Sequence, residues 1–375
     1  MDRLPDEASS RCCRHCAVSA RQHGPAFRPF LLPLHERILN MKNRKKTIWI
    51  VGGILLALLV IALIGCLLFS RYLDQKLDKI SYTPSGTYAH PQFTEEEKEL
   101  LEEESRKEKE SGNIIETSDA PPEGDVFSDK DVINILLLGT DERLPYGHDP
   151  GRADAIQVIS LNLSNGEVKL ISFERGIMVP VPDHDIDLLT HAFRWAGPEY
   201  MLSLFRDYFL MDMTGYAHVD FESFIEIIDV IGGIDVELTQ AEAWAIDRQY
   251  QFHRHLVEGV NHLDGELALK YCRLRSIDSN WHRVERQRHA IQAAMNKVKG
   301  LSLKELDALA DTVLPLIHTN LSKEQISALL LRAPKFLGST AEQMTVPLRI
   351  PGEPARCDFQ FEAERIRELI YGPEG

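Results

Sequence analysis

Arginines and carboxylates recur in five short groups along the later two thirds of the chain. The first two groups are Gly139-Thr140-Asp141-Glu142-Arg143 and Gly151-Arg152-Ala153-Asp154; the others are Glu174-Arg175, Tyr271 to Arg275, and Arg283 to Gln287. A guanidinium group binds phosphate oxygens in a bidentate manner and stays charged. Arginines that converge in the fold would therefore hold a phosphate or pyrophosphate. The alternative is that each arginine forms an ordinary surface ion pair.

Asp141 and Asp154 lie among these arginines, and an anionic ligand would repel them unless a cation lay between. Mg²⁺ is usually bound by one or two carboxylates together with waters and substrate phosphates. We therefore predict that Asp141 and Asp154 are ligands of Mg²⁺, with Mn²⁺ as an alternative ion. Phosphoryl transfer depends mainly on positioning and charge neutralisation, which such a set could supply.

The elements around these groups predict an α/β fold. Short apolar runs predict strands, and the turn Ser164-Asn165-Gly166 predicts a hairpin between two of them. Because strands alternate with helices, we expect one α-β-α domain with a central mixed sheet and ligands bound beyond the strand ends. Arg283 and Gln287 are four residues apart and share a helix face. Strands are expected at 132–138, 156–161, 168–173, 217–221 and 234–238, and helices at 198–210, 222–231, 282–299, 303–316 and 323–333.

An uncharged apolar run covers residues 48–69. As a helix it would rise about 33 Å, enough to cross a hydrocarbon core about 30 Å thick. The basic run 42–46 precedes it and would stay in the cytoplasm. We predict a single-pass protein of the cell membrane with a cytoplasmic N-terminus and an extracytoplasmic domain. A cleaved signal peptide is the alternative, but the run is longer than a signal core and lacks a clear cleavage site.

The net charge and the cysteine content limit which ligands, disulfides and metal sites we expect. The net charge is −15, and residues 72–375 hold 31 Lys and Arg against 53 Asp and Glu, a net −22. Such an acidic domain disfavours nucleic-acid binding, so an anionic ligand needs a local arginine cluster. Only Cys272 and Cys357 follow the apolar run, which argues against a disulfide framework. The fragment Cys12 to Cys16 lacks the second pair that a zinc site needs.

We divide the chain into four parts. Residues 1–46 form a basic cytoplasmic tail, 47–70 a transmembrane helix, 71–130 a charged stalk, and 131–375 the catalytic domain with its C-terminal helices. Met41 is an alternative start, in which case residues 1–40 are an over-extended reading frame; otherwise they are a disordered tail. In the stalk, Thr94 and Glu97 fit a capping box, so we expect a solvated helix whose charges serve solubility and spacing.

The segment from Val132 to Lys299 resembles the catalytic domain of the LytR-CpsA-Psr family, and the helices up to Tyr371 resemble its C-terminal end. The order and spacing of six stretches carry the resemblance: Asn134 to Asp141, Gly151 to Asp154, Gly232-Gly233-Ile234-Asp235-Val236, Leu263-Asp264-Gly265-Glu266, Arg273-Leu274-Arg275, and Arg283-Val284-Glu285-Arg286-Gln287.

This resemblance implies a cell-wall enzyme of Gram-positive bacteria. Members transfer a secondary polymer, such as teichoic acid or a capsular or other anionic polysaccharide, from undecaprenyl pyrophosphate to peptidoglycan with Mg²⁺. The expected activity is therefore a phosphotransferase that ligates glycopolymer to peptidoglycan, with pyrophosphate hydrolysis as a side activity. The expected partners are the lipid-linked glycan, peptidoglycan and membrane lipid, and no nucleic acid.

The resemblance also implies roles for individual residues. Asp141 and Asp154 would hold the metal, and Gln287 would assist by hydrogen bonding. The arginines that would clamp the pyrophosphate are Arg152, Arg175, Arg275 and Arg283, with Arg143, Arg194, Arg273 and Arg286 as second-rank candidates. The polyprenyl tail needs an apolar channel, which the sequence does not locate.

The chain departs from the family pattern after the third predicted strand. The family usually has Pro-Arg-Asp there, and this chain has Glu174-Arg175-Gly176. Neighbouring strand residues point to opposite faces, so Glu174 is not a direct substitute for the missing carboxylate. Thr190 and Asn280 likewise stand where Asn and Asp are common. Two other functions remain open: a polyprenyl-pyrophosphate-binding pseudoenzyme, and an envelope-linked transcriptional regulator or attenuator, for which no helix-turn-helix is evident.

Overall fold

The computed structural model describes residues 60, 62–65, 67–88, 92–111, 114–118, 120–141, 151–182, 184–337 and 339–373. The chain divides into two compact units, residues 1–67 and 68–375, and the second is described below. The predicted tail and most of the predicted transmembrane helix at 47–70 lie outside the described residues. Within those residues, no helix is both long and apolar enough to cross a membrane.

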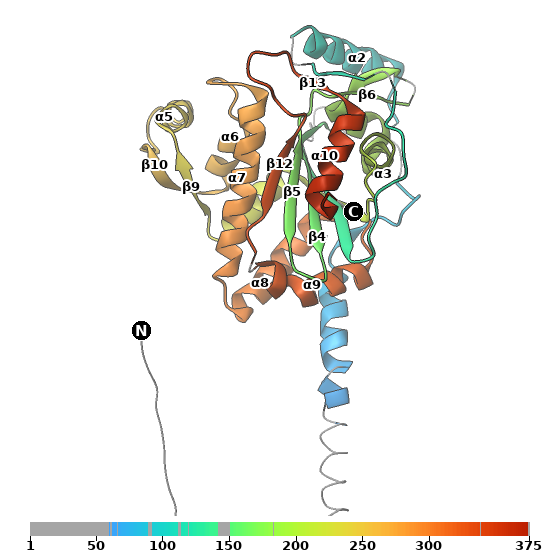
Figure 1. Ribbon diagram of the computed structural model, residues 1–375. Coiled ribbons are helices and arrows are strands. Elements are labelled where there is room, and N and C mark those ends of the chain that lie inside the picture. The colour runs from blue at the N-terminus through green and yellow to red at the C-terminus, as the bar shows by residue number, and fades with distance from the viewer. Residues whose placement is uncertain are drawn as a thin grey trace, which may run out of the picture. The chain divides into compact units, whose positions relative to one another are not determined.

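A mixed sheet of seven strands forms the centre of the described domain (Figure 1). Strand β4 runs antiparallel to both β3 and β5, whereas β8 is parallel to β3 and β12 is parallel to β5. This arrangement confirms the predicted mixed sheet. In spatial order the strands are β1 (Ser81–Tyr82), β11 (His318–Thr319), β8 (Gly215–Asp220), β3 (Val132–Thr140), β4 (Ala153–Asn162), β5 (Val168–Phe173) and β12 (Glu342–Val346).

Strands β4 and β5 form the predicted hairpin. The side-chain oxygen of Asn162 accepts hydrogen bonds from the backbone N–H groups of Ser164 and Asn165, at 2.9 and 3.1 Å. Gly166 has φ +81°, a conformation that glycine adopts without steric cost. The turn chemistry therefore fixes the register of two strands that carry proposed site residues at their ends.

Helices cover both faces of the sheet (Figure 1). Helices α3 (Leu189–Phe209) and α10 (Phe359–Tyr371) lie on one face, where Leu136, Val158 and Phe173 are buried. The other face carries α4 (Phe221–Val230), α6 (Gly265–Arg273) and α7 (Asn280–Lys299). Apolar residues predominate in the central strands β3, β4 and β5, as expected for a sheet buried on both sides.

The remaining elements lie at the edges of this sandwich. Strands β9 (Ile234–Leu238) and β10 (Gly259–Leu263) form an antiparallel pair next to α5 (Gln240–Gln249), and their apolar side chains pack with α6. Two further pairs join β2 to β13 and β6 to β7. The bounds are α8 (Leu303–Val313), a 3₁₀ turn at Leu314–Leu316, α9 (Lys323–Leu337), β2 (Glu116–Thr117), β6 (Met178–Pro180), β7 (Ile186–Leu188) and β13 (Arg356–Cys357).

One predicted helix starts earlier than expected. The prediction placed its start at Pro198, but α3 begins at Leu189 and is kinked at Gly197, which has φ +77°. Pro198 therefore opens only the second half of α3, in agreement with the preference of proline for a first helical position. The missed first half carries Thr190, His191 and Arg194, which are all buried.

The stalk contains the predicted helix, α2 (Glu95–Glu110), with the predicted capping box between Thr94 and Glu97. The expectation of a solvated spacer is wrong for this helix, because Leu101 and Ser105 are buried against the domain. Residues at spacings of three and four share a helix face, so Glu104 and Glu108 lie on the same side as these two. This face of α2 contacts the candidate site.

Candidate functional site

The ends of β3, β4 and β5 bring the predicted carboxylates and arginines together. Asp141 directly follows β3, and the pairing of Thr140 with Ala153 sets it beside Arg152. One oxygen of Asp141 accepts a hydrogen bond from the backbone N–H of Arg152 at 2.6 Å, and the other is 2.9 Å from Nη2 of its guanidinium group. Asp141 and Arg152 are both buried, which makes this pair a fixed part of the site.

Asp154 forms a second centre of contacts. Its Oδ1 atom is 2.5 Å from Nη1 of Arg175 and 3.7 Å from Nη2 of Arg275. The amide of Gln287 donates to the backbone carbonyl of Asp154 at 3.3 Å. We call Arg152, Arg175, Arg275 and Arg283 the arginine cluster. Asp154 on β4 thus contacts three predicted site residues: Arg175 after β5, Arg275 after α6, and Gln287 on α7.

Arg283 is the least compensated member of the cluster. Its side chain is 1% exposed, and its Nε and Nη2 atoms have no hydrogen-bond partner among the described residues. Burial, with the neighbouring charge of Arg275, lowers the pKa of Arg283 to about 10. Burial and two arginine neighbours also lower the pKa of Arg175. A bound anion would supply both the missing hydrogen-bond acceptors and the missing charge.

A cavity of about 620 Å³ lies beside the cluster, between the sheet and helices α4, α6 and α7. Its wall is mainly apolar and includes Leu137, Phe224 and Ile291. Arg275 and Arg283 line the same cavity. The volume is in the range of small-molecule and cofactor sites. The cavity is thus a candidate for the apolar channel that the sequence did not locate, and it suits a ligand with an apolar body and an anionic head.

The second-rank arginines differ in their surroundings. Arg273 lines the cavity and lies over the ring of Phe221 at 4.4 Å. Arg194 is buried, with Nη1 3.3 Å from Glu104. Arg143 lies outside the described residues.

The prediction for Arg286 is not supported by its contacts. Its Nε atom is 2.9 Å from Glu242, its Nη1 donates to the carbonyl of Leu274 at 2.9 Å, and its Nη2 contacts Asp278. Arg286 is three residues after Arg283 but is directed to α5 and the 274–278 segment. We assign it a structural role, because these acceptors already occupy its guanidinium group.

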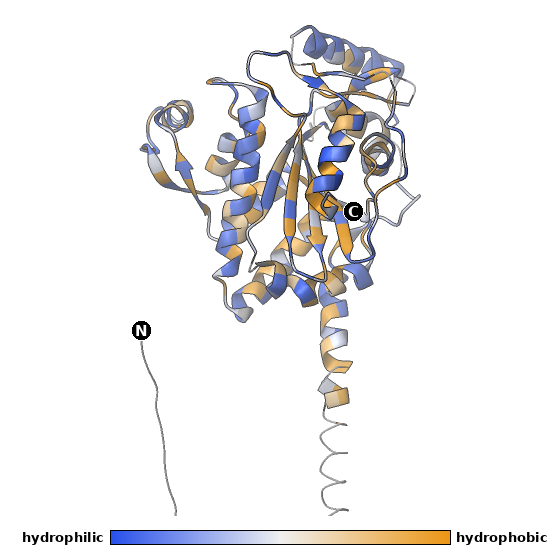
Figure 2. Cartoon of the chain, in the orientation of Figure 1, coloured by the Kyte–Doolittle hydropathy of each residue, from blue (hydrophilic) through white to orange (hydrophobic). Residues whose placement is uncertain are grey.

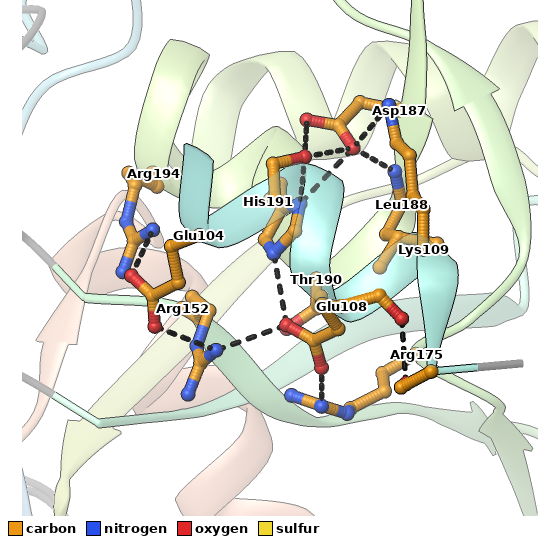
Figure 3. Close-up of polar contacts among 12 residues, drawn as sticks. Glu104, Glu108, Lys109, Arg152, Arg175, Asp187, Leu188, Thr190, His191 and Arg194 are labelled. Atoms are coloured by element: carbon orange, nitrogen blue, oxygen red, sulfur yellow. Dashed lines mark hydrogen bonds and ion pairs between the residues drawn. The ribbon is translucent and has the colours of Figure 1, made fainter. Parts of the chain in front are cut away.

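Two carboxylates that the prediction left in the stalk enter the site from α2 (Figure 3). One oxygen of Glu108 is 2.9 Å from Arg152 and 3.2 Å from Nε2 of His191, and the other contacts Nη2 of Arg175. Glu104 lies 3.2 Å from Arg152. The available sequence signal was the four-residue spacing of these glutamates, which other glutamates of the same helix share.

His191 joins α2 to the domain. Its Nδ1 atom is 3.0 Å from Asp187 and 3.2 Å from the hydroxyl of Ser105, so one ring edge faces β7 and α2. Burial lowers the pKa of His191, although Asp187 acts in the opposite direction. Burial tends to raise the pKa of Asp187, but hydrogen bonds from His191, Leu188 and Ser105 hold it well below its usual value. The polar contacts of α2 thus continue beyond the arginine cluster.

Glu174 does not replace the carboxylate missing at Gly176. Its two oxygens each lie 2.6 Å from the guanidinium group of Arg349, and its side chain is buried. This bidentate pair holds Glu174 away from Arg175, as expected for neighbouring residues at the end of a strand. At this difference from the family pattern, Glu174 therefore forms an ion pair with Arg349, while its charge still acts on Arg283.

The carboxylates suit a metal ion shared with a phosphate ligand. No group of three or more His, Cys, Asp or Glu side chains within the described ranges could hold a metal ion by itself. Both oxygens of Asp141 contact Arg152, whereas the contacts of the Asp154 carboxylate with Arg175 and Arg275 involve Oδ1. Mg²⁺ keeps waters and needs only one or two carboxylates when phosphates complete its shell. Asp154 fits this requirement, and Asp141 fits it if its contact with Arg152 loosens.

Comparison with known proteins identifies the family that the sequence motifs resemble. The model of the LytR_cpsA_psr family matches residues 87–369. A curated relative from Oceanobacillus iheyensis, the polyisoprenyl-teichoic acid–peptidoglycan teichoic acid transferase TagU, is 28% identical over 351 residues, which cover 90% of this chain and 97% of the relative.

Two solved structures share the fold. One, described as TagT bound to LIIa-WTA, has 22% identity and a TM-score of 0.53, and covers 65% of this chain and 93% of its own. The protein gbs0355 from Streptococcus agalactiae has 21% identity and a TM-score of 0.54, and covers 64% of this chain and 88% of its own. Because the family model spans most of the chain, including every member of the arginine cluster, the protein belongs to the LytR_cpsA_psr family.

Proposed function

We propose that this protein transfers an anionic cell-wall polymer from a polyprenyl pyrophosphate carrier to peptidoglycan, by Mg²⁺-dependent phosphoryl transfer at the outer face of the cell membrane. The observation that carries the proposal is the position of Arg283 in the wall of an apolar cavity, buried and with two nitrogens that have no partner among the described residues. A lipid pyrophosphate combines the apolar chain that fits such a cavity with the anion that such an arginine needs.

The arginines would hold the pyrophosphate and neutralise the charge that develops during transfer. Arg275 and Arg283 line the cavity and would meet the pyrophosphate as the lipid enters. Arg152 also lines the cavity, and Arg175 contacts Asp154; these two arginines would bind the phosphate next to the polymer. Gln287 would fix the backbone at Asp154. Phosphoryl transfer gains most from such positioning and charge neutralisation.

Asp154 and Asp141 would hold the Mg²⁺ ion together with phosphate oxygens and waters. When bound, the ion would neutralise charge on the pyrophosphate and fix its orientation. Mn²⁺ is the expected substitute ion. In transfer, the peptidoglycan hydroxyl would attack the phosphorus next to the polymer, the phosphoanhydride bond would break, and polyprenyl phosphate would leave. Water in place of this hydroxyl would break the same bond and release polymer phosphate and polyprenyl phosphate, which is the expected side activity.

The similar proteins bear on the class of polymer. The relative from Oceanobacillus iheyensis is named as a teichoic acid transferase. One of the two solved structures with the same fold is a complex of TagT with LIIa-WTA. We therefore propose teichoic acid or a related anionic polysaccharide as the donor glycan.

A carrier-binding protein without turnover is the second candidate. It is favoured by Gly176, which provides no carboxylate beside Arg175, and by the engagement of Glu174 with Arg349. Such a protein would bind the lipid pyrophosphate tightly and would release no product in Mg²⁺ or Mn²⁺.

Pyrophosphate is expected to stabilise the folded protein, because binding relieves the burial of unpaired cations. Saturation at about 100 times the Kd would contribute roughly 2.7 kcal/mol and raise Tm by about 5 °C. Differential scanning fluorimetry with inorganic pyrophosphate and Mg²⁺ measures this shift. Sodium sulfate at equal ionic strength is the control and should give a much smaller one. Equal shifts with both anions would contradict a pyrophosphate site.

A further inference from the structure

Helix α2 places negative charge inside the arginine cluster. Glu104 and Ser105 come three and four residues after Leu101, and Glu108 comes three residues after Ser105, so these four residues form the face of α2 that contacts the domain. The carboxylate of Glu108 is 12% exposed, and that of Glu104 is 32% exposed. Figure 3 shows both glutamates pointing toward the guanidinium groups. The face of α2 that contacts the domain therefore carries two carboxylates beside the buried Leu101 and Ser105.

The two carboxylates take the donors that the proposed ligand needs. Arg152 Nη1 contacts Glu108 at 2.9 Å and Glu104 at 3.2 Å, while Arg175 Nη2 contacts Glu108. Carboxylate and phosphate oxygens accept hydrogen bonds from the same guanidinium edges. One N–H group cannot serve both acceptors at full strength. A pyrophosphate that reaches Arg152 and Arg175 must therefore compete with α2.

The other half of the cluster is open to a ligand. The side chain of Arg275 is 40% exposed, and two nitrogens of Arg283 have no partner in the part of the chain that the structure describes; both arginines line the cavity. Neither arginine has a hydrogen bond or ion pair with α2 within the described part of the chain. A lipid pyrophosphate could therefore bind first at these two arginines and displace the glutamates in a second step.

Polar contacts dominate the attachment of α2. Leu101 is its one buried apolar side chain among those described, and Figure 2 shows α2 as mainly hydrophilic. Its polar contacts include Ser105 with Asp187 at 2.8 Å, Lys109 with Asp187 at 3.1 Å, and Lys109 with the carbonyl of Ile186 at 3.1 Å. Little apolar surface would be exposed if α2 moved away. An anion that competes for the arginines could therefore release the helix at a modest cost.

We propose that α2 is an anionic gate, whose Glu104 and Glu108 occupy the arginine cluster until a pyrophosphate takes their place. This inference rests on the proposed function, because it assumes that the cluster binds pyrophosphate. The gate lowers the apparent affinity for the ligand by the fraction of molecules that are closed. It also compensates the charges of Arg152 and Arg175 when no lipid carrier is bound.

The affinity test uses the full chain in detergent and inorganic pyrophosphate with Mg²⁺. Isothermal titration calorimetry compares the wild type, Glu104→Gln/Glu108→Gln, and Glu99→Gln/Glu103→Gln. The third protein is matched, because its glutamates have the same spacing on the exposed face of α2. The gate predicts that Glu104→Gln/Glu108→Gln binds at least about 10-fold more tightly, since more molecules are open, and that the control stays within about 2-fold of the wild type.

Hydrogen exchange distinguishes release of α2 from a simple change of local charge as the cause of tighter binding. Pyrophosphate should speed amide exchange across residues 95–110 of the wild type, and Glu104→Gln/Glu108→Gln should exchange fast without ligand. Unchanged protection of α2 on binding would overturn the gate, as would equal or weaker pyrophosphate affinity in Glu104→Gln/Glu108→Gln. Weaker affinity would make the glutamates part of the binding site. Absence of binding in all three proteins would instead refute the proposed function, and the gate with it.

Discussion

Replacement of Arg283 by methionine is expected to reduce polymer transfer by about 100- to 1,000-fold, the range found when one donor to a developing anion is removed. The folded protein should be no less stable than the wild type. Arg283 is buried, and two of its nitrogens lack a partner within the described ranges; an apolar side chain of similar length removes that penalty. Turnover of the lipid-linked donor and Tm in the absence of ligand measure the two effects.

Arg286→Met is the matched control for this variant. Arg286 is also buried on α7, but its guanidinium group contacts Glu242, the carbonyl of Leu274 and Asp278. Its loss should cost roughly 3 kcal/mol of stability, because two carboxylates lose their partner. Pyrophosphate affinity should change little in the molecules that remain folded. Full turnover in Arg283→Met would rule out the assigned site.

The Ala294→Phe variant is expected to weaken binding of the lipid chain without weakening binding of the pyrophosphate. Ala294 lies on α7 in the wall of the apolar cavity, and a phenyl group there would fill space that the lipid chain needs. Affinity for a polyprenyl pyrophosphate should fall by about 100-fold, which corresponds to the loss of a few buried methylene groups. Affinity for inorganic pyrophosphate should stay within about 2-fold of the wild type. Direct titration with each ligand gives both values.

Asn296→Phe provides the control for the pocket variant. Asn296 is two residues farther along α7 and is exposed, so the same ring added there leaves the cavity open. Both ligands should bind this variant as they bind the wild type. If Ala294→Phe also binds the lipid normally, the polyprenyl chain lies elsewhere.

Local signals in the sequence were sufficient for the centre of the fold. The turn at Ser164-Asn165-Gly166 predicted the β4–β5 hairpin, and Gly232-Gly233 predicted the end of α4; both glycines of that pair have positive φ. The strand at 234–238 was predicted with its observed bounds. Such signals depend on neighbouring residues, so one sequence is enough to read them.

Pairings between distant segments were not predictable in the same way. Strand β12 pairs with β5 across more than 150 residues, and its sequence Glu-Gln-Met-Thr-Val lacks a clear apolar run. Its pairing partner supplies the environment that makes it a strand. The first half of α3 was missed for a local reason. Gly197 and Pro198 look like the start of a helix, but they lie inside a longer one.

The candidate site could be predicted only in part, because the sequence does not show which distant segments pack together. Asp141, Asp154, Arg152 and Arg175 follow or precede strands whose ends meet, so their convergence could be foreseen. Arg283 and Gln287 share the expected helix face and line the cavity. The spacing of Arg286 could not show that α5 supplies its acceptors. Which face of α2 is buried depends on packing with β7 and α3, which the run of glutamates does not encode.

The most direct measurement of the proposed function is formation of the transferred product. The full chain is incubated with a polyprenyl pyrophosphate-linked oligosaccharide, peptidoglycan and Mg²⁺, and the digested wall is analysed by mass spectrometry. We predict an oligosaccharide joined to peptidoglycan through a phosphodiester, which is absent with a metal chelator and in Arg283→Met. Tight binding of the lipid with no such product in Mg²⁺ or Mn²⁺ would contradict transfer and identify a carrier-binding protein without turnover.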